Sequence, residues 1–401
     1  MLTTTFDFQS PGFVADPYPQ LDELRAQGPV LWHEPSSSWL ATTHEAVSQT
    51  LRKRAFGRIW DDWQPSNEME PFNALHRNQM MENEPPAHTR LRRLVAGAFA
   101  RGHIERMRPR VEVIAARLLD QLSFDGTVDI LGAYAEPLPV LVIADLLGVP
   151  GEDHVMLRNW SQAIVHMYEQ GVGEETRRAA VEASKAFGDY VREVVAERSK
   201  SPREDLISDL IAARDASSGS VPGKLDQDEL VASVVLLLNA GHEASVNVFG
   251  NGIHALLSRR DQLARVISGD VPMAIALEEL IRFDAPLQLF DRTATADVEV
   301  LGQTVRKGQK IAALMGSANR DAAVFADADA FDVSRDPNPH VGFGMGLHFC
   351  LGAPLARMEL EITLSRLLER FRGLHLVGEA PRRPTWVLRG FERIDVALED
   401  S

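Results

Sequence analysis

The sequence predicts a mainly helical fold with small β-sheets, formed by one domain over residues 1–401. Apolar residues recur at three- and four-residue steps, as in Met107, Val111, Ile114 and Leu118, which is typical of one face of an amphipathic helix. Shorter runs of β-branched and apolar residues are broken by turn residues, as strands are. Because no linker rich in proline, glycine or serine separates two such regions, we predict a single domain.

The same patterns locate the individual elements. Further helices are predicted over residues 150–169, 174–198, 226–257, 272–283 and 354–371. Strands are predicted within 29–42, 293–315 and 374–398. The sheets are therefore expected near the beginning of the chain and in its last third.

The composition restricts location and partners. A net charge of −15 argues against nucleic acid or an anionic membrane as the main partner. The beginning of the chain is polar and lacks the basic region of a signal peptide, and no run approaches the roughly 18 apolar residues that span a bilayer. We therefore expect a soluble, cytoplasmic, monomeric protein with no membrane or nucleic-acid partner.

The chain has a single cysteine, Cys350, which excludes intramolecular disulfides and multi-cysteine zinc or iron–sulfur sites. The glycines at 344, 346 and 352 allow tight backbone turns around it. Pro354 suits the first turn of a helix, so Cys350 lies just before a helix N-terminus, where the dipole favours a thiolate. A lone cysteine is otherwise most often a small buried apolar residue.

The segment 226–257 is the most unusual predicted helix. Asp226 and Glu229 have the spacing of a capping box, and the run VASVVLLLNA that follows is apolar on nearly every side, which indicates a buried central helix. Gly241 and the acid Glu243 then interrupt the apolar run. Either the helix reaches the surface there, or small residues admit a flat group against its backbone with Glu243 beside it.

The cysteine loop, residues 343–352, resembles the haem-ligand loop of the cytochrome P450 family, Phe-Gly-x-Gly-x-His/Arg-x-Cys-x-Gly, at every fixed position. The resemblance implies a cytochrome P450 fold, with haem b (iron protoporphyrin IX) buried between the long central helix and the helix after the cysteine. It also implies that Cys350 ligates the iron and that Phe343 contacts the haem. A thiolate ligand favours O–O cleavage.

Other segments resemble the family in the same order. Glu279 and Arg282 match the Glu-x-x-Arg of the K helix, and Arg335 matches the third member of that structural network, which supports the cysteine loop. The resemblance further assigns four residues to the haem propionates, namely His88, Arg92, Arg292 and His348.

The segment Ala240–Ser245 resembles the oxygen-activating part of the family's I helix, where an acid and a threonine deliver protons. Here Glu243 supplies the acid, but Ala244 stands at the threonine position. The hydroxyl of Ser245 lies one step, or about 100°, further round the helix. Three hypotheses remain open: a substrate hydroxyl completes the relay, Glu243 and Ser245 form a rearranged relay through a bulge or water, or proton delivery is inefficient.

By resemblance, the protein is a monooxygenase that inserts one oxygen atom of O2 into a C–H bond or an alkene of a mid-sized apolar natural product. Its pocket is expected to include Leu236, Asn239, Ala240, Leu287, Gln288, residues near Leu388 and the aromatic residues of a long loop between Trp60 and Met81. The alternatives are a peroxide-driven haem-thiolate enzyme and a non-catalytic haem-thiolate ligand-binding protein.

Electrons are expected from NAD(P)H through a separate ferredoxin reductase and ferredoxin, because no flavin- or ferredoxin-like segment is fused to the chain. Arginines between 90 and 110, including Arg101 and Arg106, concentrate positive charge in an acidic protein. They are either a docking surface for an acidic ferredoxin or an ordinary solvated helix face.

Overall fold

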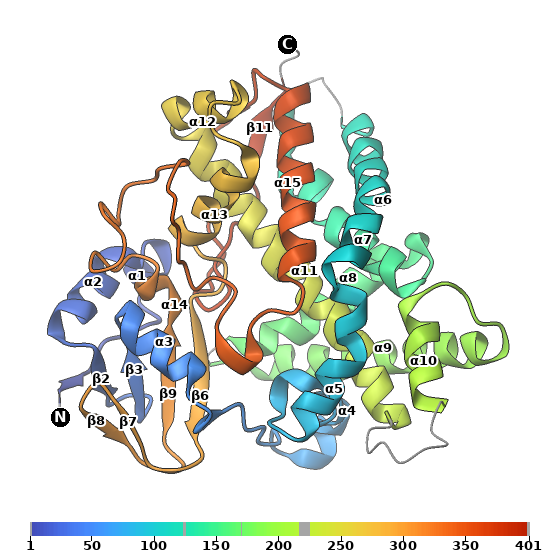
Figure 1. The fold of residues 1–401 in the computed structure, drawn as a ribbon, viewed down its shortest axis with the longest axis horizontal. Coiled ribbons are helices and arrows are strands. Elements are labelled where there is room, and N and C mark those ends of the chain that lie inside the picture. Colours follow the sequence, from blue (N-terminus) through green and yellow to red (C-terminus); the bar gives the residue numbers. More distant parts are fainter. Residues whose placement is uncertain (1, 123–125, 170, 216–224, 399–401) are drawn as a thin grey trace.

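The computed structural model describes residues 2–122, 126–169, 171–215 and 225–398. The helices are α1 (Pro11–Ala15), α2 (Tyr18–Gln27), α3 (His44–Arg52), α4 (Ser66–Arg77), α5 (Ala87–Ala96), α6 (Arg101–Asp120), α7 (Pro137–Leu147), α8 (His154–Val165), α9 (Glu174–Lys200), α10 (Leu206–Asp215), α11 (Gln227–Leu257), α12 (Arg260–Ile267), α13 (Met273–Phe283), α14 (Met315–Ala318) and α15 (Ala353–Arg370). The predicted mainly helical class is confirmed (Figure 1).

The largest sheet has the strand order β1-β2-β3-β9-β6-β4. Its strands are β1 (Thr3–Thr4), β2 (Val30–His33), β3 (Ser38–Ala41), β4 (Phe56–Gly57), β6 (Leu289–Ala294) and β9 (Lys310–Leu314). The early hairpin therefore joins the late strands in one sheet, since Trp39 of β3 pairs in parallel with Ile311 of β9. Arg292 of β6 lies opposite the same isoleucine.

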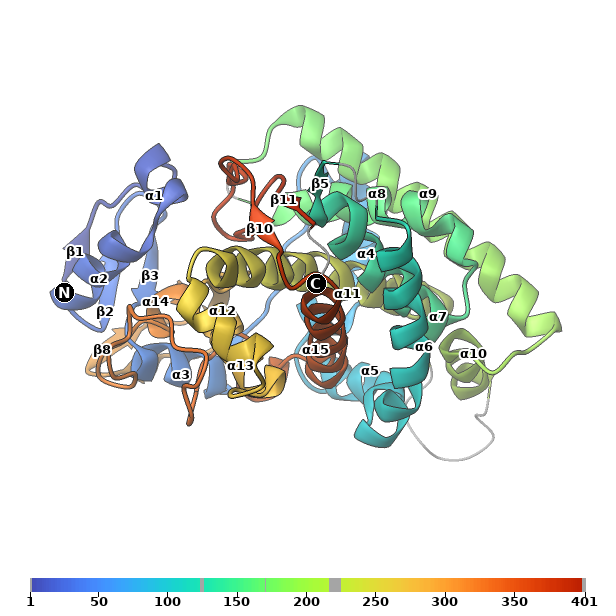
Figure 2. The ribbon, with the colours of Figure 1, turned by 90° about the horizontal axis from the view of Figure 1, so that it is seen from above.

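Two smaller sheets complete the β-structure of the described residues. The strands β10 (His375–Leu376), β11 (Asp395–Ala397) and β5 (Thr127–Asp129) form one, and β7 (Val298–Val300) pairs with β8 (Gln303–Val305). The six-stranded sheet and the helices α1 to α3 lie on one side of the molecule, and most other helices lie on the opposite side (Figures 1 and 2).

Helix α11 crosses the middle of the molecule (Figure 2). The predicted capping box is present, because the Asp226 side chain accepts from the backbone N–H of Glu229 and the Glu229 side chain accepts from that of Asp226. The helix is long and apolar enough to cross a bilayer, but 83% of its most apolar window is buried inside the protein. It is therefore the central core helix that the sequence predicted.

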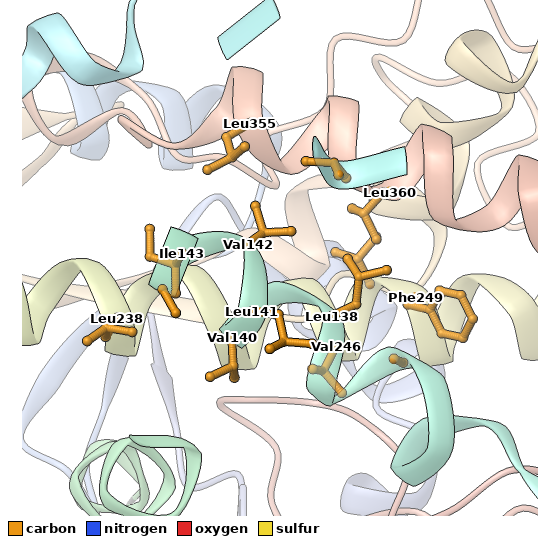
Figure 3. Close-up of a cluster of buried hydrophobic side chains, with 14 of the residues drawn as sticks. Leu138, Val140, Leu141, Val142, Ile143, Leu238, Val246, Phe249, Leu355 and Leu360 are labelled. Carbon is orange, nitrogen blue, oxygen red and sulfur yellow. The ribbon is translucent and has the colours of Figure 1, made fainter. Parts of the chain in front are cut away.

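Helix α7 packs between α11 and the helix α15 that follows the cysteine loop. Figure 3 shows Val142 and Ile143 of α7 lying between Leu238 of α11 and Leu355 of α15, with Leu138 further along α11 near Val246. This apolar layer ties α11 to α15 and so fixes the two elements that carry the predicted site.

One local prediction was wrong. The region from Trp60 to Met81 is not a long loop, because α4 occupies Ser66–Arg77. Proline disfavours a helix interior, yet α4 contains Pro71 within its length.

Candidate active site

A cavity of ≈ 420 Å³ lies where α11 and the cysteine loop meet β6, α15 and the C-terminal segment. Its lining is largely apolar and includes Ile143, Leu236, Ala240, Leu287, Leu289 and Leu388. The volume lies within the range of about 300–1,000 Å³ that is usual for small-molecule sites. Cys350 lines the same cavity, so the only thiol of the chain faces this space.

Glycine makes the cysteine loop possible. Gly344 and Gly346 have positive φ angles of 68° and 69°, and a Cβ on Gly346 would approach the Leu51 carbonyl oxygen to 2.4 Å. The backbone N–H of Cys350 donates to the carbonyl of Phe343 at 2.9 Å, which closes the loop. Helix α15 begins at Ala353 directly after it, as the sequence predicted.

The environment of the Cys350 sulfur combines opposing effects. Burial raises the pKa of the thiol, whereas hydrogen bonds from the backbone N–H groups of Gly352 and Ala353, together with the charge of Arg92, act to lower it. The first turn of α15 thus aims donors at the sulfur, which is the arrangement that stabilises a thiolate ligand.

A group of cationic and hydrogen-bonding side chains lines one end of the cavity. It consists of Arg58, His88, Arg92, Arg292 and His348. The ring centroids of His88 and His348 are 4.5 Å apart, and burial, the His348 charge and the Arg92 charge lower the pKa of His88 to about 4. Burial and the neighbouring Arg58 lower the pKa of Arg292 to about 9. The positive charges of these side chains repel one another, and a bound anion would offset that repulsion.

The hydrogen bonds that this group makes within the protein leave some of its N–H groups free to bind a ligand. Both ring nitrogens of His88 are buried without a hydrogen-bond partner in the described residues. Arg92 Nη2 donates to the carbonyl of Phe349 at 2.8 Å, and His348 Nε2 lies 2.8 Å from Glu84 Oε1. Unsatisfied buried nitrogens near a thiol and an apolar cavity fit a haem, whose iron needs the sulfur and whose two carboxylates need donors.

Arg58 was not predicted from the sequence. It follows β4 and forms an ion pair with Glu82, and its guanidinium lies 5.1 Å from the Phe290 ring centroid. The Arg292 guanidinium is 5.4 Å from the same ring centroid, so the two cations share one aromatic side chain. Arg58 lies in no motif that would have identified it.

The network of Glu279 forms as the resemblance implies. The Glu279 carboxylate accepts from Arg282 Nε at 2.7 Å and from Arg335 Nε at 3.2 Å. Asn338 Nδ2 and the backbone N–H of Asp332 also donate to it, at 3.1 and 2.9 Å. The buried pair of α13 is thereby tied to the segment that leads into the cysteine loop.

On the central helix, Glu243, Ala244 and Ser245 all line the cavity. Every residue from Gln227 to Leu257 is α-helical, so Ser245 reaches the cavity without a bulge. The Glu243 carboxylate forms an ion pair with Arg383, and Arg383 Nη2 lies 3.8 Å from Glu136 Oε1. Glu243, Arg383 and Glu136 thus form a series of ion pairs, and Glu243 is the member that lines the cavity.

A second acid of the cavity was missed. Glu359 of α15 lines the cavity and is 4% exposed, and burial raises its pKa from 4.5 to about 8. A carboxyl with this pKa carries a proton at neutral pH and can donate it. Its sequence context, Met-Glu-Leu-Glu within a predicted helix, does not distinguish a buried acid from an exposed one.

The predicted substrate residues divide into two groups. Leu236, Asn239, Ala240 and Leu287 line the cavity. Gln288 does not, and its assignment to the pocket was wrong: its amide donates to the Ala285 carbonyl at 2.7 Å and to the Tyr18 hydroxyl at 3.3 Å.

The aromatic residues expected in the long loop pack elsewhere. The Trp60 ring stacks on His76 with a centroid distance of 4.6 Å, and the Phe72 ring stacks on the same histidine at 4.0 Å. Met80 and Met81 supply the contribution of this region to the cavity.

Comparison with known proteins agrees with this geometry. A model described as Cytochrome P450 matches residues 273–390. The 6-deoxyerythronolide B hydroxylase of Saccharopolyspora erythraea is 35% identical over 412 residues, covering 99% of this chain and 100% of that protein. The mycinamicin IV hydroxylase/epoxidase of Micromonospora griseorubida is 37% identical, covering 88% of each chain.

Among solved structures, P450BioI in complex with an acyl carrier protein ligated to hexadec-9Z-enoic acid superposes with a TM-score of 0.92. The two chains are 30% identical, with 98% of this chain and 100% of the other covered. A lone cysteine at a cavity, a donor cluster beside it and relatives that match over the whole length lead to one conclusion. The chain belongs to the cytochrome P450 family of haem-thiolate monooxygenases.

Proposed function

We propose that this monooxygenase hydroxylates or epoxidises a mid-sized apolar natural product with O2 as co-substrate. The observation that carries the proposal is the Cys350 thiol at an apolar cavity of ≈ 420 Å³. For each turnover one oxygen atom enters the substrate and the other leaves as water, which consumes two electrons and two protons. The haem supplies the oxidising chemistry when bound, and the chain orients the substrate.

We further propose which residues hold the cofactor, haem b. Cys350 would ligate the iron, with Phe343 packed in the same loop. His88, Arg92, Arg292 and His348 would bind the propionates, and Arg58 would join them, because all five of these side chains line one end of the cavity. Ion pairs and donors of this kind are strongest where water is excluded.

The protons would come through Ser245 and the buried acid Glu243 of α11, with a substrate hydroxyl and ordered water acting where Ala244 has none. All three residues line the cavity, which supports the proposal. Glu243 is also paired with Arg383. Glu359 would not take part, because it lies on α15, the helix after Cys350, and so would face the opposite side of the haem.

We propose a separate ferredoxin and ferredoxin reductase, fed by NAD(P)H, as the source of electrons. Phe349, beside the cysteine, is 41% exposed and would lie in the docking surface. Of the nearby arginines, Arg110 and Arg108 already have acidic neighbours, Asp145 at 3.2 Å and Glu105 at 3.3 Å. The side chain of Arg101 lies outside the described residues, so the exposed Arg93 and Arg106 are the described candidates for docking.

The location and assembly are also proposals: a soluble, cytoplasmic monomer that acts as a single domain over residues 1–401. The relative bound to an acyl carrier protein suggests a second form of substrate, a fatty acyl group tethered to a carrier. A binding test with free and carrier-linked fatty acyl groups distinguishes the two forms.

The decisive experiment is the carbon monoxide difference spectrum of the reduced protein. We expect the red-shifted Soret band of a thiolate-ligated haem, and its loss in Cys350→Ser with an unchanged far-UV circular dichroism spectrum. A wild-type protein without that band refutes the proposal. A spectral binding screen and product analysis then identify the substrate; equal turnover with peroxide alone would favour the peroxide-driven enzyme, and absence of any product would favour a ligand-binding protein.

A further inference from the structure

Glu169 joins two parts of the chain that are more than two hundred residues apart. It follows the 3-10 turn His166–Tyr168 after α8, and its Oε1 accepts the backbone N–H of Leu388 at 3.0 Å. The backbone amides of Trp386 and Val387 act on the same carboxylate and help to lower its pKa. The hydrogen bond to Leu388 thus joins this side chain directly to the C-terminal segment.

The two parts that Glu169 joins both line the cavity. Val165 and Tyr168, just before it, line the cavity from the end of α8, and Val387 and Leu388 line it from the C-terminal segment. Glu169 therefore links two segments of the cavity wall that are distant in sequence.

We propose that Glu169 is a positioning residue that sets the shape of the substrate cavity by holding Val387 and Leu388 against Tyr168. It acts through those side chains and does not itself line the cavity. The inference deepens the proposed function, because it takes this cavity as the substrate site. It identifies a specificity determinant in a residue that no sequence motif marks.

The other attachments of the C-terminal segment use different backbone groups. The carbonyl of Val387 accepts from the backbone N–H of Gln288 at 2.9 Å, and Leu388 forms an isolated antiparallel bridge with Leu287. Thr385 Oγ1 closes the turn by donating to the Leu388 carbonyl at 3.0 Å. None of these bonds uses the N–H of Leu388, so removal of the Glu169 carboxylate leaves that amide without its acceptor.

Charge is not what the contact needs. Burial raises the pKa of Glu169, against the lowering effect of the amides that donate to it. A glutamine keeps the carbonyl oxygen that accepts from Leu388 and avoids the cost of a buried charge. Glu169→Gln should therefore preserve the contact, and Glu169→Ala should remove it.

Hydrogen exchange on the holoenzyme tests the contact itself. In Glu169→Ala we expect the amide of Leu388 to exchange at least about tenfold faster, as the loss of about 1.4 kcal/mol of local protection would give. Glu169→Gln and the exposed control Glu174→Ala should exchange like the wild type. Unchanged protection in Glu169→Ala, or equal loss in Glu169→Gln, overturns the proposal.

Binding of two haem-iron ligands of different size tests the effect on the cavity. With 4-phenylimidazole, Glu169→Ala should dissociate about tenfold faster than the wild type, whereas dissociation of imidazole, which is too small to reach this wall, should stay the same. Equal changes for both ligands would overturn the positioning role. The carbon monoxide spectrum of the same samples tells this failure apart from a failure of the proposed function, since it reports the haem thiolate alone.

Discussion

Replacing Glu359 with glutamine should stabilise the protein, and by more at higher pH. Glu359 is 4% exposed on α15, and burial raises its pKa from 4.5 to about 8. Between these values the unfolded chain has lost the proton that the folded protein keeps, so this carboxyl makes the folded state less stable as pH rises. Linkage gives about 1.4 kcal/mol for each pH unit above 4.5, or about 3 kcal/mol at pH 7.

Glutamine has the same shape and stays neutral, so this loss of stability should vanish in the variant. Well below pH 4.5 the carboxyl is neutral in both states, and the two proteins should have similar free energies of unfolding there. At pH 7 Glu359→Gln should be more stable by about 3 kcal/mol, and above pH 8 the gain should level off.

Urea unfolding at pH 5, 7 and 8.5, on samples with equal haem content, measures these free energies. Glu361→Gln is the matched control, because it lies on the same helix with a side chain that is 37% exposed and 3.7 Å from Arg108. Exposed pairs of this kind are worth about 1 kcal/mol or less, so the control should stay close to the wild type. A Glu359→Gln protein that is destabilised equally at all three pH values would show that a hydrogen-bonded carboxylate, and not a neutral acid, occupies this position.

Two further substitutions test the relay and the buried network. Ala244→Thr places a hydroxyl at the cavity wall of α11 and should change the fraction of reductant that ends in product; identical coupling with every substrate tested would mean that position 244 does not control proton delivery. Glu279→Ala removes the acceptor of Arg282, which is fully buried, and should lower the free energy of unfolding by about 3–5 kcal/mol. Arg335→Ala, at a side chain 11% exposed, should cost less in the same urea titration, and an equal cost would contradict this assignment.

The sequence predicted most of the long helices from their periodicity or their cap, and missed several shorter ones, α4 and α7 among them. Helix α11 was located at its N-terminus by Asp226 and Glu229. Helix α7 reads PLPVLVIADLL and is apolar on all sides, so it has no periodicity to detect. Helix α4 contains Pro71, which argues against a helix until tertiary packing overrides the preference.

The sequence predicted the site residues that belong to a continuous motif. It did not predict the contacts between residues that are far apart in the chain. The cysteine loop is one continuous segment, and its glycines are required by the backbone itself. The partner of Glu243 is Arg383, 140 residues away, and no pattern links them. Gln288 was misplaced by a single residue: Leu287 points into the cavity, and the next side chain of an extended segment points away from it.

The C-terminal segment explains how an irregular stretch of chain can shape a specific cavity. Strands and helices hold most of the lining, but Val387 and Leu388 lie outside both. Side-chain contacts replace the missing ladder: Arg389 pairs with the buried Asp284 at 2.8 Å, Arg383 pairs with Glu243 of the central helix, and Glu169 accepts from the backbone N–H of Leu388. Each of these contacts holds one residue of the segment in place, so the amino acids between them can differ without loss of the fold. This arrangement is expected where relatives of one fold accept different substrates.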